Sequence, residues 1–213
     1  KAMTAKTGAP EAAAQAAGWI WFEDRLAYDN ARLAQALIAT GAATGRRDLA
    51  TAGLAALRWL VAMQTAPGGY FRPVGSAGIA ASGCFADPIR APRRFDQQAL
   101  EAAATVSACL AAWRLDGDPG WRRSARQAFD WFLGVNDLAL MLADTRTGGC
   151  RDGLHPDRAN ENQGAESVLS YLLSLVEMRH AARDAGDLPA TARLHAVGNR
   201  LPSAETVLQA LGD

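Results

Sequence analysis

Hydrophobic residues recur along the chain at helical spacing, and they mark two kinds of helix. Residues 99–113 are apolar on nearly every side, and residues 165–176 share this pattern. Helices of this kind are normally buried among other elements. Residues 121–135 instead place tryptophan, alanine and phenylalanine on one face and arginine on the opposite face. This second pattern predicts outer helices that keep one face in water.

Both patterns repeat with a common period. Polar clusters precede the predicted inner helices, and their equivalent positions Asp29, Asp96 and Asn162 are 67 and 66 residues apart. In the outer helices, the sequence around Trp59 reappears around Trp131, 72 residues later. Two helices in each unit of about 70 residues are typical of stacked helical hairpins. We therefore expect an all-α fold in which about three to four helical hairpins are visible.

The connections between helices predict where a functional site would lie. Short links that contain glycine join inner to outer helices near residues 45, 117 and 186. Long segments rich in glycine and proline, at 65–94 and 137–160, lead from outer to inner helices. In antiparallel hairpins, both long segments and the polar helix starts must share one end. Because loops on a rigid scaffold often carry function, we expect the site at that end.

Composition and charge support the helical fold and exclude several classes of function. Alanine makes up about a fifth of the chain, which favours helix. The 22 basic and 22 acidic residues give a formal net charge of zero, so the chain lacks the basic excess that attracts nucleic acid or an anionic membrane. No apolar stretch approaches the roughly 20 residues that cross a bilayer. The three cysteines are far apart in the sequence, which favours a reducing, cytoplasmic location over a disulfide framework, with a mature secreted fragment as the alternative.

The polar end of the predicted array combines carboxylates, amides and aromatic rings, which suits a carbohydrate ligand. Carboxylates and amides hydrogen-bond paired hydroxyl groups, and aromatic faces pack on the apolar face of a sugar ring. Glycoside cleavage needs two carboxyl groups opposed across one bond. The candidate catalytic residues are Glu23, Asp24, Asp96, Glu101 and Glu166. The candidate substrate-binding residues are Trp21, Tyr28, Asp29, Asn30, Tyr70, Arg72, Gln97, Gln98, Asp152, His155, Asn162 and Gln163.

Several of these candidates have a purely structural alternative. Asp29, Asp96 and Asn162 stand at helix starts, where a polar side chain commonly caps the free N–H groups of the first turn. Glu101 and Glu166 lie one turn further, on helices with few charges. A carboxylate there must be paired, hydrogen-bonded or face a cavity.

Other polar features are interpreted as surface charges or turns, and they argue against phosphate-binding and metal sites. Glu23 and Asp24 lie in a predicted loop, where the alternative is a solvated charge. The glycine-rich segments 68–73 and 148–153 are interpreted as turns, because neither has the Lys-Ser/Thr pair of a phosphate loop. No group of His, Asp or Glu has the spacing of a zinc site, so we expect no metal and no cofactor.

Three segments taken together resemble a known family. They run from Trp21 to Leu33, from Phe95 to Glu101 and from Asn162 to Ser167. Their sequences resemble the helical C-terminal domain of bacterial glycosyltransferase-like proteins, within the six-hairpin glycosidase-like superfamily. The resemblance implies an α/α toroid that acts on carbohydrate through a funnel at the starts of the inner helices. It transfers no catalytic pair to this chain.

The resemblance also sets an expectation for domain organisation. A closed ring of this type has six hairpins, so we expect a partial or truncated α/α toroid. We expect a single helical-hairpin domain over residues 1–213, which is a fragment or the C-terminal part of a larger protein. Residues 184–213 lose the repeat pattern and are expected to form a degenerate capping tail.

Two functions from different classes follow from these observations. The leading hypothesis is a glycosidase-like domain that acts on or binds a glycan. The alternative is a non-catalytic module that binds glycan or packs against a glycosyltransferase domain of the same polypeptide, or that self-associates to complete the ring. A catalyst needs a close carboxyl pair in a pocket, whereas a binding module needs aromatic and amide groups without it. A terpenoid-type toroid fits less well, because the sequence lacks an Asp-rich metal motif.

Overall fold

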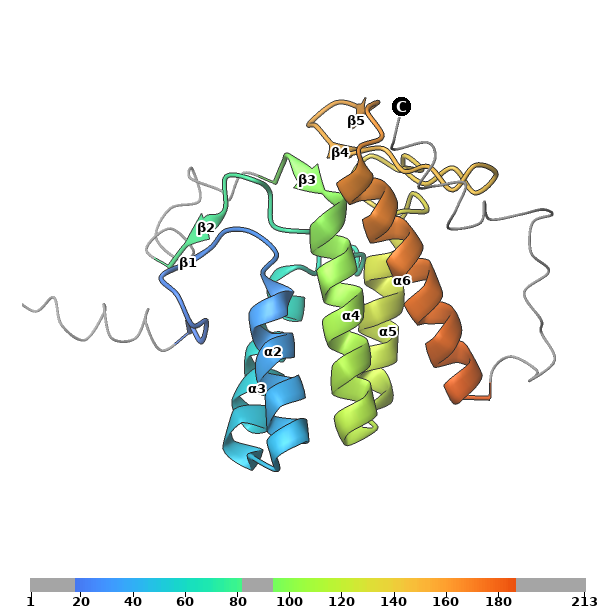
Figure 1. Ribbon diagram of the computed structural model, residues 1–213. Coiled ribbons are helices and arrows are strands. Elements are labelled where there is room, and N and C mark those ends of the chain that lie inside the picture. Colours follow the sequence, from blue (N-terminus) through green and yellow to red (C-terminus); the bar gives the residue numbers. More distant parts are fainter. Residues whose placement is uncertain (1–17, 82–93, 187–213) are drawn as a thin grey trace, which may run out of the picture. The chain divides into compact units, whose positions relative to one another are not determined.

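Helices dominate the computed structural model, which describes residues 18–81 and 94–186 (Figure 1). About 52% of this described part is helical, in five helices. These are α2 (Ala31–Thr44), α3 (Arg47–Met63), α4 (Ala99–Asp116), α5 (Pro119–Asp130) and α6 (Ala165–Asp184). The chain divides into two compact units, Lys1–Arg179 and His180–Asp213, and the packing described below lies within the first. The expectation of a mostly helical fold is confirmed.

Short glycine links join α2 to α3 and α4 to α5, as predicted. Gly45 and Gly117 follow α2 and α4 with φ angles of 68° and 74°, the left-handed conformation that glycine adopts most readily. Asp118 then accepts a hydrogen bond from the backbone N–H of Gly120 and caps α5, with Pro119 in the first turn. Each link therefore ends one helix and starts the next without an intervening loop.

Close packing between α2 and α3 depends on glycine. A Cβ atom at Gly41 would lie 2.6 Å from the backbone nitrogen of Ala50, and a Cβ atom at Gly53 would lie 2.9 Å from the carbonyl oxygen of Ala34. No side chain fits at either distance without movement of the backbone. The two helices consequently approach more closely than larger residues would allow.

The central helix α4 matches the prediction of an inner helix that is buried on all sides. Its buried residues run almost without interruption from Ala99 to Ala112. It packs against α5, which follows it, and against α2 from the preceding hairpin. The outer helix α5 buries Trp121, Ala125 and Phe129 while Arg126 stays exposed. The predicted distinction between inner and outer helices is confirmed for this pair.

The prediction of all-round burial is wrong for the first turns of α6. One face is buried, and Tyr171 on that face stacks against Phe129 of α5 at a ring-centroid distance of 6.2 Å. Leu169 and Leu173, on the opposite side, are 56% and 57% exposed. In the described part of the chain, no further helix covers this apolar face.

Five short strands of the described residues, which the sequence patterns did not predict, lie in the segments before and between the helices (Figure 1). Strand β1 (Arg25–Leu26) pairs antiparallel with β2 (Ile79–Ala80). Strand β4 (Gly153–Leu154) pairs antiparallel with both β3 (Gln97–Gln98) and β5 (Ala159–Asn160). Because β3 runs directly into α4, this small sheet brings the second long connection to the start of the central helix.

Parts of the expected domain organisation lie outside the described residues. The predicted capping tail at 184–213 is described only as far as residue 186. Within the described part, no helix is both long and apolar enough to cross a membrane.

Candidate functional site

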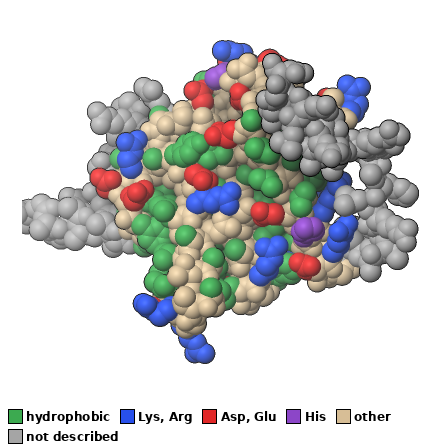
Figure 2. All heavy atoms as spheres, viewed as in Figure 1, with side chains coloured by type: hydrophobic (Ala, Val, Ile, Leu, Met, Phe, Trp, Pro, Cys, Tyr) green, Lys and Arg blue, Asp and Glu red, His purple; other side chains and the backbone are tan. Residues whose placement is uncertain are grey.

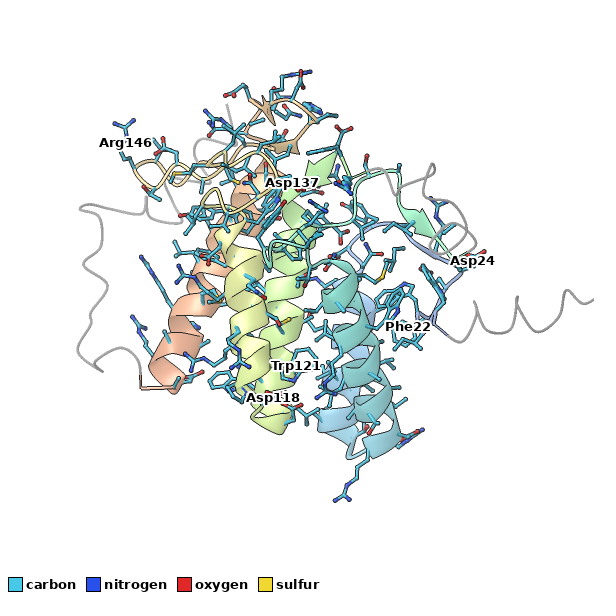
Figure 3. The ribbon with its side chains drawn as sticks, turned by 180° about the vertical axis from the view of Figure 1, so that it is seen from behind. Phe22, Asp24, Asp118, Trp121, Asp137 and Arg146 are labelled. Atoms are coloured by element: carbon cyan, nitrogen blue, oxygen red, sulfur yellow. The ribbon has the colours of Figure 1, made fainter. Side chains whose placement is uncertain are left out.

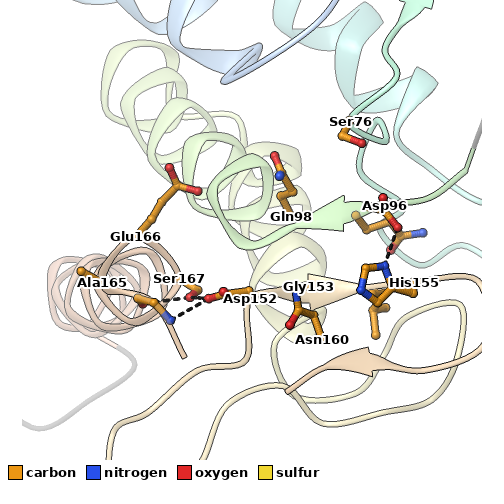
Figure 4. Close-up of a pocket in the computed structure, with 13 residues that line it drawn as sticks. Ser76, Asp96, Gln98, Asp152, Gly153, His155, Asn160, Ala165, Glu166 and Ser167 are labelled. Atoms are coloured by element: carbon orange, nitrogen blue, oxygen red, sulfur yellow. Dashed lines mark hydrogen bonds and ion pairs between the residues drawn. The ribbon is translucent and has the colours of Figure 1, made fainter. Parts of the chain in front are cut away.

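A cavity of about 370 Å³ opens at the end of the bundle where the sequence predicted a site (Figure 4). It lies between β3, the β4–β5 hairpin and the first turn of α6. The lining is mainly polar and includes three carboxylates, one imidazole, three amides and two hydroxyl groups. The lining residues are Ser76, Asp96, Gln97, Gln98, Asp152, Gly153, Leu154, His155, Asn160, Gly164, Ala165, Glu166 and Ser167.

Strand pairing positions two sides of this cavity. Gln97 is opposite Leu154 and Gln98 is opposite Gly153 in the β3–β4 ladder. A Cβ atom at Gly153 would lie 2.0 Å from the carbonyl oxygen of Gln97. Only glycine therefore permits this approach of β4 to β3, and the approach brings the residues after β4 close to the residues before β3.

Asp96 and His155 lie in direct contact in the cavity wall. The Nδ1 atom of His155 lies 2.6 Å from Oδ1 of Asp96. The carbonyl oxygen of Asp96 accepts a hydrogen bond of 2.9 Å from the backbone N–H of Ser76. The Asp96 side chain is 52% exposed, so one carboxylate oxygen can meet a ligand while the other contacts the imidazole. The structure contradicts the N-cap alternative for Asp96, because the N-cap position of α4 is Gln98.

Glu166 projects into the cavity from another element. It lies in the first turn of α6, and its Oε2 atom accepts a hydrogen bond of 2.8 Å from the hydroxyl group of Tyr28. This bond raises the pKa of Tyr28, because the ionised phenol would face a carboxylate. Figure 4 shows Glu166 and Asp96 on opposite sides of the pocket, with Gln98 between them.

Asp152, which also lines the cavity, caps the start of α6. Its Oδ1 atom accepts hydrogen bonds from the backbone N–H of Gly164, at 2.7 Å, and from the hydroxyl group of Ser167. It therefore satisfies free donors at the start of α6, where a negative charge is also favoured by the helix dipole. The predicted cap of this helix, Asn162, is exposed, and its carbonyl oxygen accepts a hydrogen bond from the Asp152 N–H.

Glu101 does not line the cavity, although it was a candidate catalytic residue. Its side chain is buried in α4, with the residue only 3% exposed, and its Oε2 atom accepts a hydrogen bond of 3.0 Å from the side-chain amide of Asn30. Burial raises the pKa of Glu101 to about 7, and the bond from Asn30 opposes that shift. The other carboxylate oxygen has no hydrogen-bond partner among the described residues.

Tyr70, Arg72 and Gln97 are tied into an internal network rather than left free for a ligand. All three donate hydrogen bonds to the carboxylate of Asp137, at 2.7 Å from the Tyr70 hydroxyl and 2.6 Å from the Gln97 amide. The Gln97 carbonyl group accepts a bond of 2.9 Å from the indole of Trp131. Burial pushes the pKa of Asp137 upward, but the three donors outweigh it and the net pKa lies below its ordinary value. The network holds the first long connection against β3, behind the cavity.

Sequence reasoning missed Asp137, although it is the centre of this network. It follows the predicted outer helix at the start of a long loop, where an aspartate is ordinary. One signal was available in the sequence. Tyr70 and Arg72 are two hydrogen-bond donors close together in the first long connection, and such donors favour a nearby acceptor.

The aromatic segment 19–22 lies elsewhere and does not form a platform in the cavity. Trp21 is buried and stacks on Trp59 of α3 at 6.1 Å between ring centroids. Glu23 and Asp24 are exposed in the same segment, and neither lines the cavity. Figure 3 shows Asp24 and Phe22 beside α3, apart from Asp137.

Two further candidates also lie outside the cavity lining. Asp29 pairs with Arg32 at 3.4 Å on the surface of α2. Gln163 lines a separate hollow next to Arg151 and Asp144. In the part of the chain that the structure describes, no three His, Cys, Asp or Glu side chains are grouped as a metal ion would require.

Comparison with known proteins adds no assignment. No model of a known protein family and no curated protein matches this chain.

Proposed function

We propose that this chain is a carbohydrate-active domain of the helical-hairpin type, and that the cavity between β3, β4 and α6 binds and cleaves a glycan. One observation carries the proposal. Asp96, just before β3, and Glu166, in the first turn of α6, face a common cavity of about 370 Å³. The amides of Gln98 and Asn160 line the same cavity and can bind sugar hydroxyl groups. The repeated hairpins and the resemblance of three segments support a partial α/α toroid as the parent fold.

The two carboxyl groups have different neighbours, which suits different chemical roles. The imidazole of His155 contacts one oxygen of Asp96 and orients it, and this half-exposed carboxyl group is assigned as the base that takes a proton from water. Glu166 accepts a hydrogen bond from the Tyr28 hydroxyl through Oε2, and its second oxygen is assigned to donate a proton to the leaving sugar oxygen when the carboxyl group is protonated, which leaves Glu166 as the carboxylate. Water then adds to the anomeric carbon as the glycosidic C–O bond breaks.

The test is release of reducing sugar from a panel of oligosaccharides. The intact protein should release sugar from at least one member, and Asp96→Asn and Glu166→Gln should each lower kcat about 100-fold or more. Asp157→Asn is the matched control, because Asp157 lies on the same β4–β5 hairpin, is exposed and pairs with the exposed Arg158. Full activity in both cavity variants would contradict the assignment of these carboxyl groups.

A second candidate function is supported by the exposed face of α6. Leu169, Leu172, Leu173 and Val176 form an apolar stripe along one side of this helix, and Figure 2 shows hydrophobic side chains gathered over its first turns. Contiguous apolar surface of this kind favours contact with further protein. On this proposal the chain is a non-catalytic module that packs against a glycosyltransferase domain or a second copy to complete a ring. Glycan binding without sugar release, together with self-association in sedimentation velocity, would favour it.

The proposed location is the cytoplasm. Cys109 and Cys150 are buried free thiols, which are stable in a reducing compartment. Fractionation of cells that express the full-length protein tests this location.

A further inference from the structure

Glu101 carries a buried carboxyl group that is only partly hydrogen-bonded, and burial of an ionisable group is costly without partners. One oxygen is bonded to the side-chain amide of Asn30, and the other has no hydrogen-bond partner among the described residues. The backbone oxygen of Glu101 accepts a bond of 2.9 Å from Thr105, whose hydroxyl group also contacts the Gln64 side chain. The backbone N–H groups of Asp29 and Asn30 also lower the pKa of the Glu101 carboxyl group, so this group acts on the segment before α2.

Asn30 connects this buried group to the segment that precedes α2. Its side-chain oxygen accepts a hydrogen bond of 2.9 Å from the backbone N–H of Ala27, while its amide nitrogen donates to Glu101. The two bonds close the short turn 27–30 and anchor it to α4. Tyr28 lies within this turn, and its hydroxyl group reaches Glu166 at 2.8 Å.

Glu101 is thus linked to the cavity through a short chain of contacts. The chain runs from Glu101 to Asn30, then through the turn to Tyr28, and ends at Glu166 on the cavity wall. It joins the starts of α2, α4 and α6, which are far apart in the sequence. A change at Glu101 can consequently move the hydroxyl group that contacts Glu166.

We propose that Glu101 is a positioning residue whose protonation state sets how firmly the turn 27–30 holds Tyr28 against Glu166. When Glu101 is ionised, it is a stronger acceptor for the Asn30 amide, because charge-assisted hydrogen bonds are the stronger ones. When it is protonated, the bond to Asn30 is weaker and the turn is held less firmly. The role rests on the proposed function only in giving Glu166 a part in the chemistry.

The charges around Glu101 are consistent with such a switch near neutral pH. Asp29 is the acidic neighbour that acts on it directly, and Tyr28 experiences the charges of Glu101, Asp29 and Glu166 together. On the side of α3, Thr105 contacts both the backbone oxygen of Glu101 and the side chain of Gln64, which is uncharged. Burial raises the pKa of Glu101 to about 7, so its charge changes within the physiological range.

The test follows the side-chain resonances of Tyr28 and Asn30 by NMR between pH 5 and 9, without any sugar present. In the intact protein both sets should shift with one midpoint near pH 7, which is the pKa of Glu101. In Glu101→Gln, the Gln carbonyl group is an uncharged acceptor for the Asn30 amide, like the protonated acid, so the shifts should resemble the low-pH form and stay flat. The control Asp29→Asn, which removes the nearest other acid, should retain the midpoint.

Asn30→Ala is the second variant, for the case in which Glu101→Gln does not fold. Asn30→Ala leaves Glu101 in place but cuts its link to the turn, so Tyr28 should no longer respond near pH 7 and its pKa should fall toward 10.0. A midpoint near pH 7 that persists at Tyr28 in either variant would overturn the proposal, as would the absence of that midpoint in the intact protein. The NMR measurement needs no substrate. The proposal about Glu101 and the proposal of glycan cleavage can therefore be contradicted independently of each other.

Discussion

His155 and Asp96 lie 2.6 Å apart although 59 positions separate them in the sequence. The contact exists because β4 pairs with β3, which brings the second long connection to the start of α4. The two long connections thus meet at one cavity, and the Asp96–His155 contact lies where they meet.

We expect His155→Ala to lower the rate of sugar release without removing ligand binding. The imidazole contacts the carboxylate that is assigned as the base, and its loss leaves Asp96 less well oriented. The predicted change is a fall in kcat of roughly tenfold or more with KM nearly unchanged. Steady-state kinetics on an oligosaccharide that the intact protein cleaves measure both values. An increased KM with an unaltered kcat would place His155 in binding alone.

Gly153→Ala should disrupt the cavity without unfolding the helical bundle. The added methyl group would meet the carbonyl oxygen of Gln97 at 2.0 Å, so β3 and β4 must separate. Far-UV circular dichroism should stay close to that of the intact protein, because α2 to α5 are not involved, while glycan binding is lost. Retained binding would show that the β3–β4 contact is not needed for the site.

Asp137→Ala should destabilise the protein by about 2 kcal/mol, because it leaves the partly buried guanidinium of Arg72 without its carboxylate. The matched control is Asp157→Ala, in which the lost partner is the exposed Arg158 and the expected change is below about 1 kcal/mol. Urea unfolding followed by tryptophan fluorescence measures both. Equal effects in the two variants would mean that the Asp137 network contributes no more than a surface ion pair.

The same network should contribute to acid sensitivity. The pKa of Asp137 is lower in the folded protein than its ordinary value of 3.8, so its stabilising effect is present above that value and is lost as pH falls through the folded pKa. Asp137→Asn, which cannot ionise, should lose less free energy of unfolding than the intact protein when pH is lowered below about 4. A parallel loss in both proteins would contradict this contribution.

Glu101 should have the opposite effect on stability. Its pKa is raised from 4.5 in the unfolded chain to about 7 in the folded protein, so the folded state binds more protons between these values. The stabilising contribution is therefore complete below about pH 4.5 and is lost as pH rises through 7, by an amount on the order of 3 kcal/mol. Glu101→Gln should show a flatter stability profile than the intact protein between pH 4.5 and 7. A steeper profile in the variant would contradict the raised pKa.

The helices were predictable from the sequence because their signals are local. The alternation of apolar and half-polar helices, and the glycine links at residues 45 and 117, follow from periodicity and from the conformation that glycine adopts. The exposure of Leu169 and Leu173 was not predictable in this way. An apolar helix face shows that a partner is favoured, but it does not show whether the described chain supplies one.

The site was predictable only as a set of residue types at one end of the bundle. Asp96, His155 and Glu166 were candidates, and the structure brings all three to one cavity. Tyr70 and Arg72 were expected at the ligand but contact Asp137, because pairing between two distant loops decides which polar groups are already used. The short strands that decide this pairing are only two residues long, so they leave no periodic pattern in the sequence.

The central claim is that the cavity between β3, β4 and α6 is a carbohydrate site, and mapping of glycan binding by NMR tests it most directly. Titration with an oligosaccharide from the panel should shift the backbone resonances of Gln98, Asn160 and Glu166, and Asp96→Asn should weaken the binding. Resonances around Trp21 and Trp59 should stay unchanged, because that cluster lies outside the cavity lining. Shifts confined to the Trp21–Trp59 cluster, or no shifts with any glycan of the panel, would contradict the claim.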